Sequence, residues 1–84
     1  MEIEEHNTET GYHMGVYLCL GQPIHRLTHD DSISIQCFHS YEEIHQYMSK
    51  NGKIFVFLGE GKHKIKKKAE QVACDEAIKV LNNF

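Results

Sequence analysis

GEGKHKIKKKAEQVACDEAI, residues 59–78, is the stretch of sequence that decides the fold. Its start follows a β-rich run, and from residue 65 onward apolar or small residues recur every three or four positions. This period gives a helix one apolar face. We expect residues 62–82 to be helical, with Ala69, Val72, Ala73, Ala77 and Val80 buried against a sheet. The full apolar stripe comprises Ile65, Ala69, Val72, Ala73, Ala77, Val80, Leu81 and Phe84.

A dense block of lysines opens this helix. Five of the nine basic residues fall within seven positions, namely Lys62, Lys64, Lys66, Lys67 and Lys68. Cations in a first helical turn oppose the helix dipole, so they cost helix stability while adding positive potential where an anion binds. The net charge of −3 does not argue against a polyanion, because four of the twelve acids lie in the first ten residues. Local potential at a binding face matters more than the total charge.

The same stretch resembles, without gaps, the end of the third strand and the start of the second helix of a double-stranded-RNA-binding domain. Such domains occur at the C-terminus of ribonuclease III-type proteins. The matching residues are Gly59 and Gly61 for the glycine turn, Lys66 and Lys67 for the lysine pair, and Ala69, Ala73 and Ala77 for the small packing positions. Two positions depart from the family pattern, since Ile65 replaces a serine or threonine and Glu70 replaces an often basic residue.

The resemblance implies an α+β fold of the order α-β-β-β-α, with a three-stranded antiparallel sheet packed against the long C-terminal helix. It also implies a non-catalytic module that reads duplex shape and phosphates over about 16 base pairs. The RNA-binding residues would be Lys62, His63, Lys64, Lys66 and Lys67. The acidic signature of ribonuclease III is absent, so catalysis would lie in a parent chain or a partner.

Upstream, alternating residues predict strands over 14–20, 32–38 and 53–58, and we expect 53–59 to pair antiparallel with 32–38. Residues 59–61 would close the last strand as a turn. A helix over about 10–20 is the alternative for the first strand, because Tyr12, Val16 and Leu20 are spaced by four. An extra short helix is expected at 40–50, where Ser40 and Glu43 fit a capping box and Gly52 fits a helix stop.

The length of 84 residues predicts one domain, with a flexible acidic tail at 1–10 and the RNA-binding-like domain at 11–84. No apolar run approaches the roughly 18 residues that a bilayer span needs, so no membrane partner is expected. The N-terminus lacks the pattern of a secretory signal. Three widely spaced cysteines do not suggest a disulfide framework, which favours a reducing compartment, the cytoplasm or the nucleus.

The histidines and cysteines of the chain do not indicate a metal site or a catalytic centre. The seven histidines and three cysteines lack common zinc spacings, so neither a metal nor a cofactor is predicted. Cys74 is expected to be a small buried core residue rather than a nucleophile. The family's first helix has no counterpart among residues 1–13, and its Gly-Pro-x-His loop is also absent. These departures favour the alternative function, a domain of the same fold that serves protein–protein interaction or homodimerisation.

Overall fold

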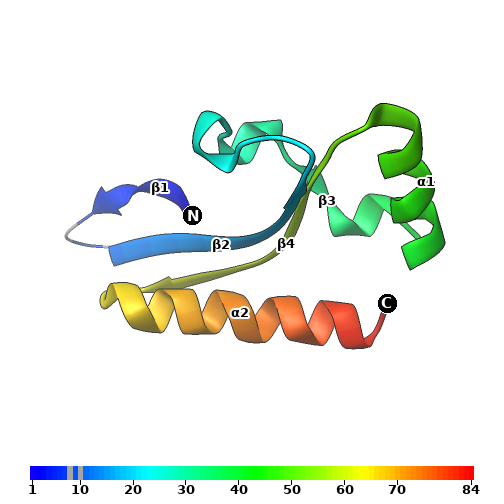
Figure 1. Cartoon of the computed structure of the whole chain (residues 1–84). Coiled ribbons are helices and arrows are strands. Elements are labelled where there is room, and N and C mark those ends of the chain that lie inside the picture. The colour runs from blue at the N-terminus through cyan, green and yellow to red at the C-terminus, as the bar shows by residue number, and fades with distance from the viewer. Residues whose placement is uncertain (8, 10) are drawn as a thin grey trace.

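A computed structural model describes residues 1–7, 9 and 11–84 and shows, within them, a four-stranded mixed sheet in the order β1-β2-β4-β3 (Figure 1). The strands are β1 (Glu2–Asn7), β2 (Gly11–Leu20), β3 (Ile33–Ser34) and β4 (Ile54–His63), and the helices are α1 (Tyr41–Asn51) and α2 (Lys66–Asn82). Helix α2 runs along one face of β2 and β4. The predicted α+β class and the long C-terminal helix packed on the sheet are confirmed.

The long antiparallel pair of β2 and β4 is the centre of the fold. Pairing runs from Tyr12 with His63 to Leu20 with Ile54, with one register shift after Val16. Both strands are longer than the alternation predicted, because β4 continues through residues 59–61 to His63. Helix α2 consequently begins at Lys66 rather than at residue 62. Residues 11–20 are a strand, so the alternative helix there is wrong.

The predicted strand at 32–38 is largely wrong. Only Ile33 and Ser34 are in a strand, and they pair with Val56 and Phe57 in parallel, not antiparallel. The strand ends because the Ser34 side chain accepts a hydrogen bond from the Gln36 amide at 3.3 Å, which starts the 3-10 turn Ile35–Cys37. The pairing is parallel because α1 connects β3 to β4 along the chain. A connection through a helix lets the second strand run in the same direction as the first.

The predicted N-terminal tail contains strand β1, which pairs antiparallel with β2. The terminal amine of Met1 donates to the Gly15 carbonyl at 3.0 Å, and the Gly15 amide donates to the Met1 carbonyl at 2.7 Å. The polar composition of this segment hid the strand, since an edge strand can form without an alternating apolar pattern. The parts of the tail prediction that concern Thr8 and Thr10 lie outside the described residues.

Gly59 and Gly61 lie inside β4 and not in a turn, which corrects the sequence prediction. A Cβ at Gly61 would lie 2.5 Å from the Ala69 carbonyl oxygen, and one at Gly59 would lie 2.7 Å from the Ala77 amide nitrogen. The two glycines therefore allow the backbone of α2 to approach the strand closely. This packing explains why glycine on the strand is matched by alanine on the helix.

The buried stripe of α2 is narrower than predicted. Ala69, Ala73 and Ala77 are buried as expected, and Val80 is half-buried, but Val72 is 39% exposed. Ile65 and Cys74 are exposed, so their predicted places in the core are wrong. The close contact with β4 leaves room for one row of alanines, while larger neighbours are displaced to its flanks. The buried apolar residues are Met14, Ile35, Ile44, Ile54, Phe55, Val56, Leu58, Ala69, Ala73 and Ala77.

Helix α1 confirms the predicted short helix and its caps. The Ser40 hydroxyl accepts a hydrogen bond from the Glu43 amide at 3.3 Å, and Gly52 takes a left-handed conformation at φ 74°. The Glu43 carboxylate accepts a hydrogen bond from the His39 amide, one residue before the N-cap. In the described part of the chain, no helix combines the length and the apolar character that crossing a bilayer requires.

The Glu43 cap predicts a dependence of helix stability on pH. The hydrogen bond from the His39 amide lowers the pKa of the Glu43 carboxyl below its ordinary value of 4.5. A depressed carboxyl pKa contributes stability above the unfolded-state pKa, and this contribution is lost as the pH falls through the folded-state pKa. We expect Glu43→Gln to melt at a lower temperature than the wild type at neutral pH, with the difference shrinking below about pH 4. Equal differences at both pH values would contradict this role.

Candidate nucleic-acid interface

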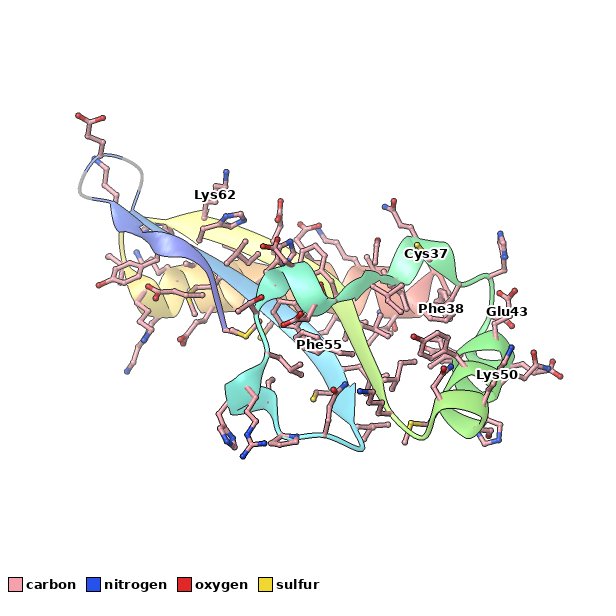
Figure 2. All side chains as sticks on the ribbon, turned by 90° about the horizontal axis from the view of Figure 1, so that it is seen from above. Cys37, Phe38, Glu43, Lys50, Phe55 and Lys62 are labelled. Carbon is pink, nitrogen blue, oxygen red and sulfur yellow. The ribbon has the colours of Figure 1, made fainter. Side chains whose placement is uncertain are left out.

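The residues predicted to bind RNA lie together at one end of the molecule. Lys62 and His63 end strand β4, Lys64 lies in the following turn, and Lys66 and Lys67 open helix α2. The four lysines are exposed and His63 is half-buried. Figure 2 shows Lys62 at the opposite end of the molecule from α1, which carries the labelled Glu43 and Lys50. The structure therefore gathers the lysines that the sequence placed in one block.

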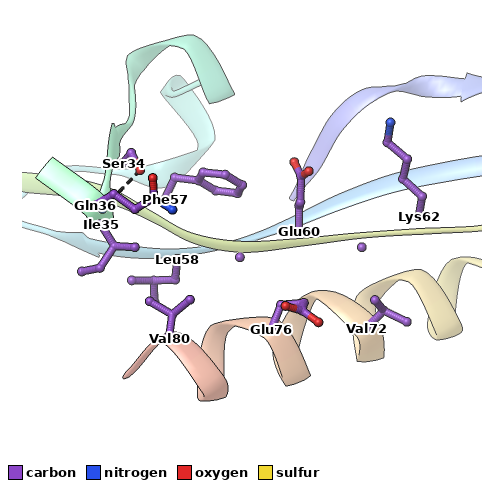
Figure 3. A pocket seen from close by; sticks show the side chains of 12 residues that line it. Ser34, Ile35, Gln36, Phe57, Leu58, Glu60, Lys62, Val72, Glu76 and Val80 are labelled. Atoms are coloured by element: carbon purple, nitrogen blue, oxygen red, sulfur yellow. Dashed lines mark hydrogen bonds between the residues drawn. The ribbon is translucent and has the colours of Figure 1, made fainter. Parts of the chain in front are cut away.

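These residues do not share one face of the sheet. Lys62 points away from α2, on the same side as Glu60, as Figure 3 shows. Lys66 and Lys67 belong to the helix, on the other side of β4. The basic end is thus a rim that wraps around the end of β4 and the start of α2.

His63 has a positioning role that the sequence did not reveal. Its Nδ1 accepts a hydrogen bond from the Ile65 amide at 2.9 Å, across the turn between β4 and α2. The His63 side chain thereby fixes the backbone of residues 63–65, from which the flanking side chains of Lys64 and Lys66 extend. In β2, Tyr12 is the residue paired with His63, which ties this turn to the sheet.

The first turn of α2 is electropositive for two reasons. Its N-cap is Ile65, which offers no side-chain acceptor, and its first turn carries no acidic residue. The early backbone N–H groups of a helix have no partner within the helix and carry the positive end of the dipole. Helix α1 differs, since Ser40 caps it and Glu42 and Glu43 lie in its first turn. Of these two helices, α2 has the N-terminus suited to an anion.

Glu60 and His13 were missed by the sequence prediction of the site. They meet beside Lys62, with His13 Nε2 3.0 Å from a carboxylate oxygen of Glu60. In the register of β2 and β4, His13 pairs with Lys62. Continuing the alternation of residues 53–58 would have put Glu60 and Lys62 on the same face as Leu58. The register shift at Leu58 turns them to the opposite face, away from α2 (Figure 3). The basic rim therefore has an acidic neighbour on the open face of the sheet, and no acidic residue at the start of the helix.

An aromatic cluster covers the face of the sheet opposite α2, farther along the strands. The Tyr17 ring stacks on Phe55 with centroids 5.0 Å apart, and Phe57 lies 5.4 Å away. His29 approaches Phe57 edge-on at 4.8 Å, and its Nδ1 lies 2.8 Å from the Tyr17 hydroxyl oxygen. Phe55 is buried. These rings pack on one another and on the 29–31 turn, so they do not form an open platform for stacked bases.

This packing predicts an unusual titration. Burial, and secondarily the charge of Glu60, raises the pKa of the Tyr17 hydroxyl to about 12. The folded-state pKa lies above the unfolded value of about 10, so the stabilising contribution is complete below pH 10 and is lost as the pH rises towards 12. An alkaline titration of tyrosinate absorbance should show one step near 12 that Tyr17→Phe removes. If the absorbance that Tyr17→Phe removes instead titrates near pH 10, the assignment is contradicted.

Among the described residues, no group of three or more histidine, cysteine, aspartate or glutamate side chains is placed to hold a metal ion. Comparisons with protein-family models, with curated proteins and with solved structures found no match to the chain. Function is therefore inferred from the residues and the geometry of this chain itself.

Proposed function

We propose that this chain is a non-catalytic module that binds double-stranded RNA through the basic rim. The rim consists of Lys62, His63, Lys64, Lys66 and Lys67. The observation that carries the proposal is the exposure of its four lysines around an uncapped helix start that has no acidic residue in its first turn. Lysines and free helix amides both bind phosphate oxygens without reading base sequence.

The order of the elements supports an RNA duplex as the polyanion. Strands β1, β2 and β4 are antiparallel neighbours, and α2 follows β4 directly. This is the β-β-β-α order expected after the first helix of the resembled family, with residues 21–53 as an insertion before the last strand. Lys66 and Lys67 then occupy the positions at which the resemblance places phosphate contacts across a major groove.

The proposed contact is centred on the start of α2. Within the described residues, β1 and not a helix precedes β2, so the minor-groove contact expected of the family's first helix has no counterpart there. We therefore expect these residues to cover fewer than the roughly 16 base pairs that a complete domain spans. Affinity should be modest and strongly dependent on salt, since phosphate contacts dominate.

A binding titration tests the proposal. Fluorescence anisotropy would be measured for a 20-base-pair RNA duplex, a DNA duplex of equal length and a single-stranded RNA, each at low and at moderate salt. The RNA duplex should bind most tightly, and its sequence should not matter. Lys50→Ala/Lys53→Ala is a matched control, because these exposed lysines lie in and after α1, away from the rim. Equal affinity for the RNA duplex and for single-stranded RNA would overturn the proposal.

The setting of the module follows from the same proposal. The resemblance suggests service to a ribonuclease III-type nuclease, with catalysis supplied by another part of a parent chain or by a partner. Cys19, Cys37 and Cys74 are free thiols, and Cys37 and Cys74 are exposed. Exposed thiols suit a reducing compartment such as the cytoplasm or the nucleus, which we propose as the location.

A further inference from the structure

Strand β4 has an edge that is open along half of its length. One edge pairs with β2 from Ile54 to His63. The other edge pairs with β3 only at Val56 and Phe57, and no described strand pairs with residues 58–63 there. Alternate backbone N–H and C=O groups along an open edge are free to bond to another strand.

A groove of about 460 Å³ runs between this open edge and α2 (Figure 3). Leu58 and Val80 line it at one end, and Val72 overhangs it from the helix. Val72 is 39% exposed, although it lies in the most regular apolar stripe of the chain. An open strand edge beside exposed apolar side chains is the arrangement that a further strand and helix would cover.

The charged side chains along this edge can form opposite-charge pairs with those of a second copy of the same edge. Glu60 and Lys62 flank Gly61 and point to the same face of the sheet. If two copies of β4 pair antiparallel about Gly61, Glu60 of each copy lies opposite Lys62 of the other. Shifting the centre to Glu60 or to Lys62 would instead place like charges opposite each other, which is unfavourable. The charges therefore select one register, because sheet pairing must keep each side chain on its own face.

The helices meet in the same arrangement. A Cβ at Gly61 would lie 2.7 Å from the Val72 Cβ, so a two-fold axis through Gly61 passes beside Val72. Lys68 and Glu76 lie four residues before and after Val72, on the same row of α2. Two antiparallel copies of α2 would thus place Lys68 of each opposite Glu76 of the other. Helix α2 packs on β4 and also on β2, and two helices that meet through side chains such as Val72 pack at about 8–10 Å.

We propose that the chain forms a symmetric homodimer in which two copies of β4 pair antiparallel about Gly61 and the two α2 helices pack at Val72. The sheets join into one continuous sheet, and the open groove of each copy is filled by the other. This goes beyond RNA binding, since it assigns a second surface and its occupant. Lys62 turns towards Glu60 of the second copy, while Lys64, Lys66 and Lys67 of both copies stay available to phosphates.

Charge reversal on the helix tests the dimer without RNA. Sedimentation equilibrium would be run on the wild type, on Glu76→Lys, on Lys68→Glu and on their equimolar mixture. Either single variant places like charges across both copies of the pair, so self-association should weaken by about tenfold. The mixture restores opposite charges at both positions, so a heterodimer should form with near wild-type affinity. Glu76 also lies 3.5 Å from Lys79, but this exposed pair is weak.

Matched controls are available on α1, far from the groove. Glu42→Lys, Lys50→Glu and their mixture make the same charge changes at exposed sites, and they should associate like the wild type. Amide hydrogen exchange locates the dimer interface, because dimerisation should protect alternate amides of residues 58–63 from exchange. A chain that stays monomeric up to about 1 mM would overturn the proposal. So would a dimer that ignores charge reversal at residues 68 and 76, or that leaves the amides of 58–63 unprotected.

Discussion

Ala73→Asp is expected to lower the free energy of unfolding by about 3–5 kcal/mol, which is enough to unfold much of a domain of this size. Ala73 has no exposed surface, and it belongs to the helix row that contacts the glycines of β4. A Cβ at Gly61 would already lie 2.6 Å from the Ala73 amide nitrogen, so no space exists for a longer side chain. The carboxylate would be buried without a partner, or α2 would have to leave the sheet.

Urea denaturation followed by circular dichroism measures this effect. Gln71→Asp is the matched control, because it adds the same charge to an exposed position of the same helix. The control should change stability by no more than about 0.5 kcal/mol. A midpoint for Ala73→Asp within the error of the control would show that α2 does not pack on β4 through its alanine row.

Replacing both Lys66 and Lys67 by alanine is the second substitution with a large expected effect. It should weaken binding to every RNA duplex by about ten- to a hundredfold at low salt, whatever the base sequence, because it removes the charges that face the phosphates. The slope of log affinity against log salt should become shallower by about one unit for each phosphate that is no longer neutralised. Fold stability should stay the same or rise slightly, since cations leave the positive end of a helix.

A control variant and a contradicting result can be stated for the Lys66→Ala/Lys67→Ala prediction. Lys50→Ala/Lys53→Ala removes the same charge elsewhere and should cost little affinity beyond a general electrostatic effect. If the folded Lys66→Ala/Lys67→Ala protein binds duplexes with unaltered affinity and an unaltered salt slope, the start of α2 does not touch the RNA. The dimer proposal concerns the open edge of β4 and the row of Lys68, Val72 and Glu76, so this result would leave it standing.

Local signals in the sequence were sufficient where one segment determines its own structure. Ser40 and Gly52 mark the ends of α1, and both cap it as their chemistry predicts. The alanine spacing predicts the buried row of α2, because a helix turns its face to the sheet once every 3.6 residues. The exposure of the lysine block followed from the same period. None of these features needs information from a distant part of the chain.

The sequence-based predictions were wrong where contacts with distant segments determine the local structure. Glycine occurs both in turns and where two backbones approach closely, so its presence alone does not distinguish the two. Only the packing of α2 shows that Gly59 and Gly61 serve a close approach. Because the strand continues past them, Glu60 and Lys62 share a face and His63 holds the turn. Strand β3 is parallel because of the α1 crossover, and β1 forms only because β2 offers an edge. The residue pattern of β3 does not predict its pairing with β4, and the pattern of β1 does not predict its pairing with β2.

The most direct test of RNA binding is an NMR titration of the isotope-labelled chain with an unlabelled 20-base-pair RNA duplex. Binding at the basic rim predicts progressive amide shifts concentrated in residues 62–68, with the amides of α1 unchanged and the shifts reversed by added salt. The same titration with single-stranded RNA should give weaker shifts. Amides that stay unshifted at excess duplex, or that shift chiefly on α1, would contradict the proposed function.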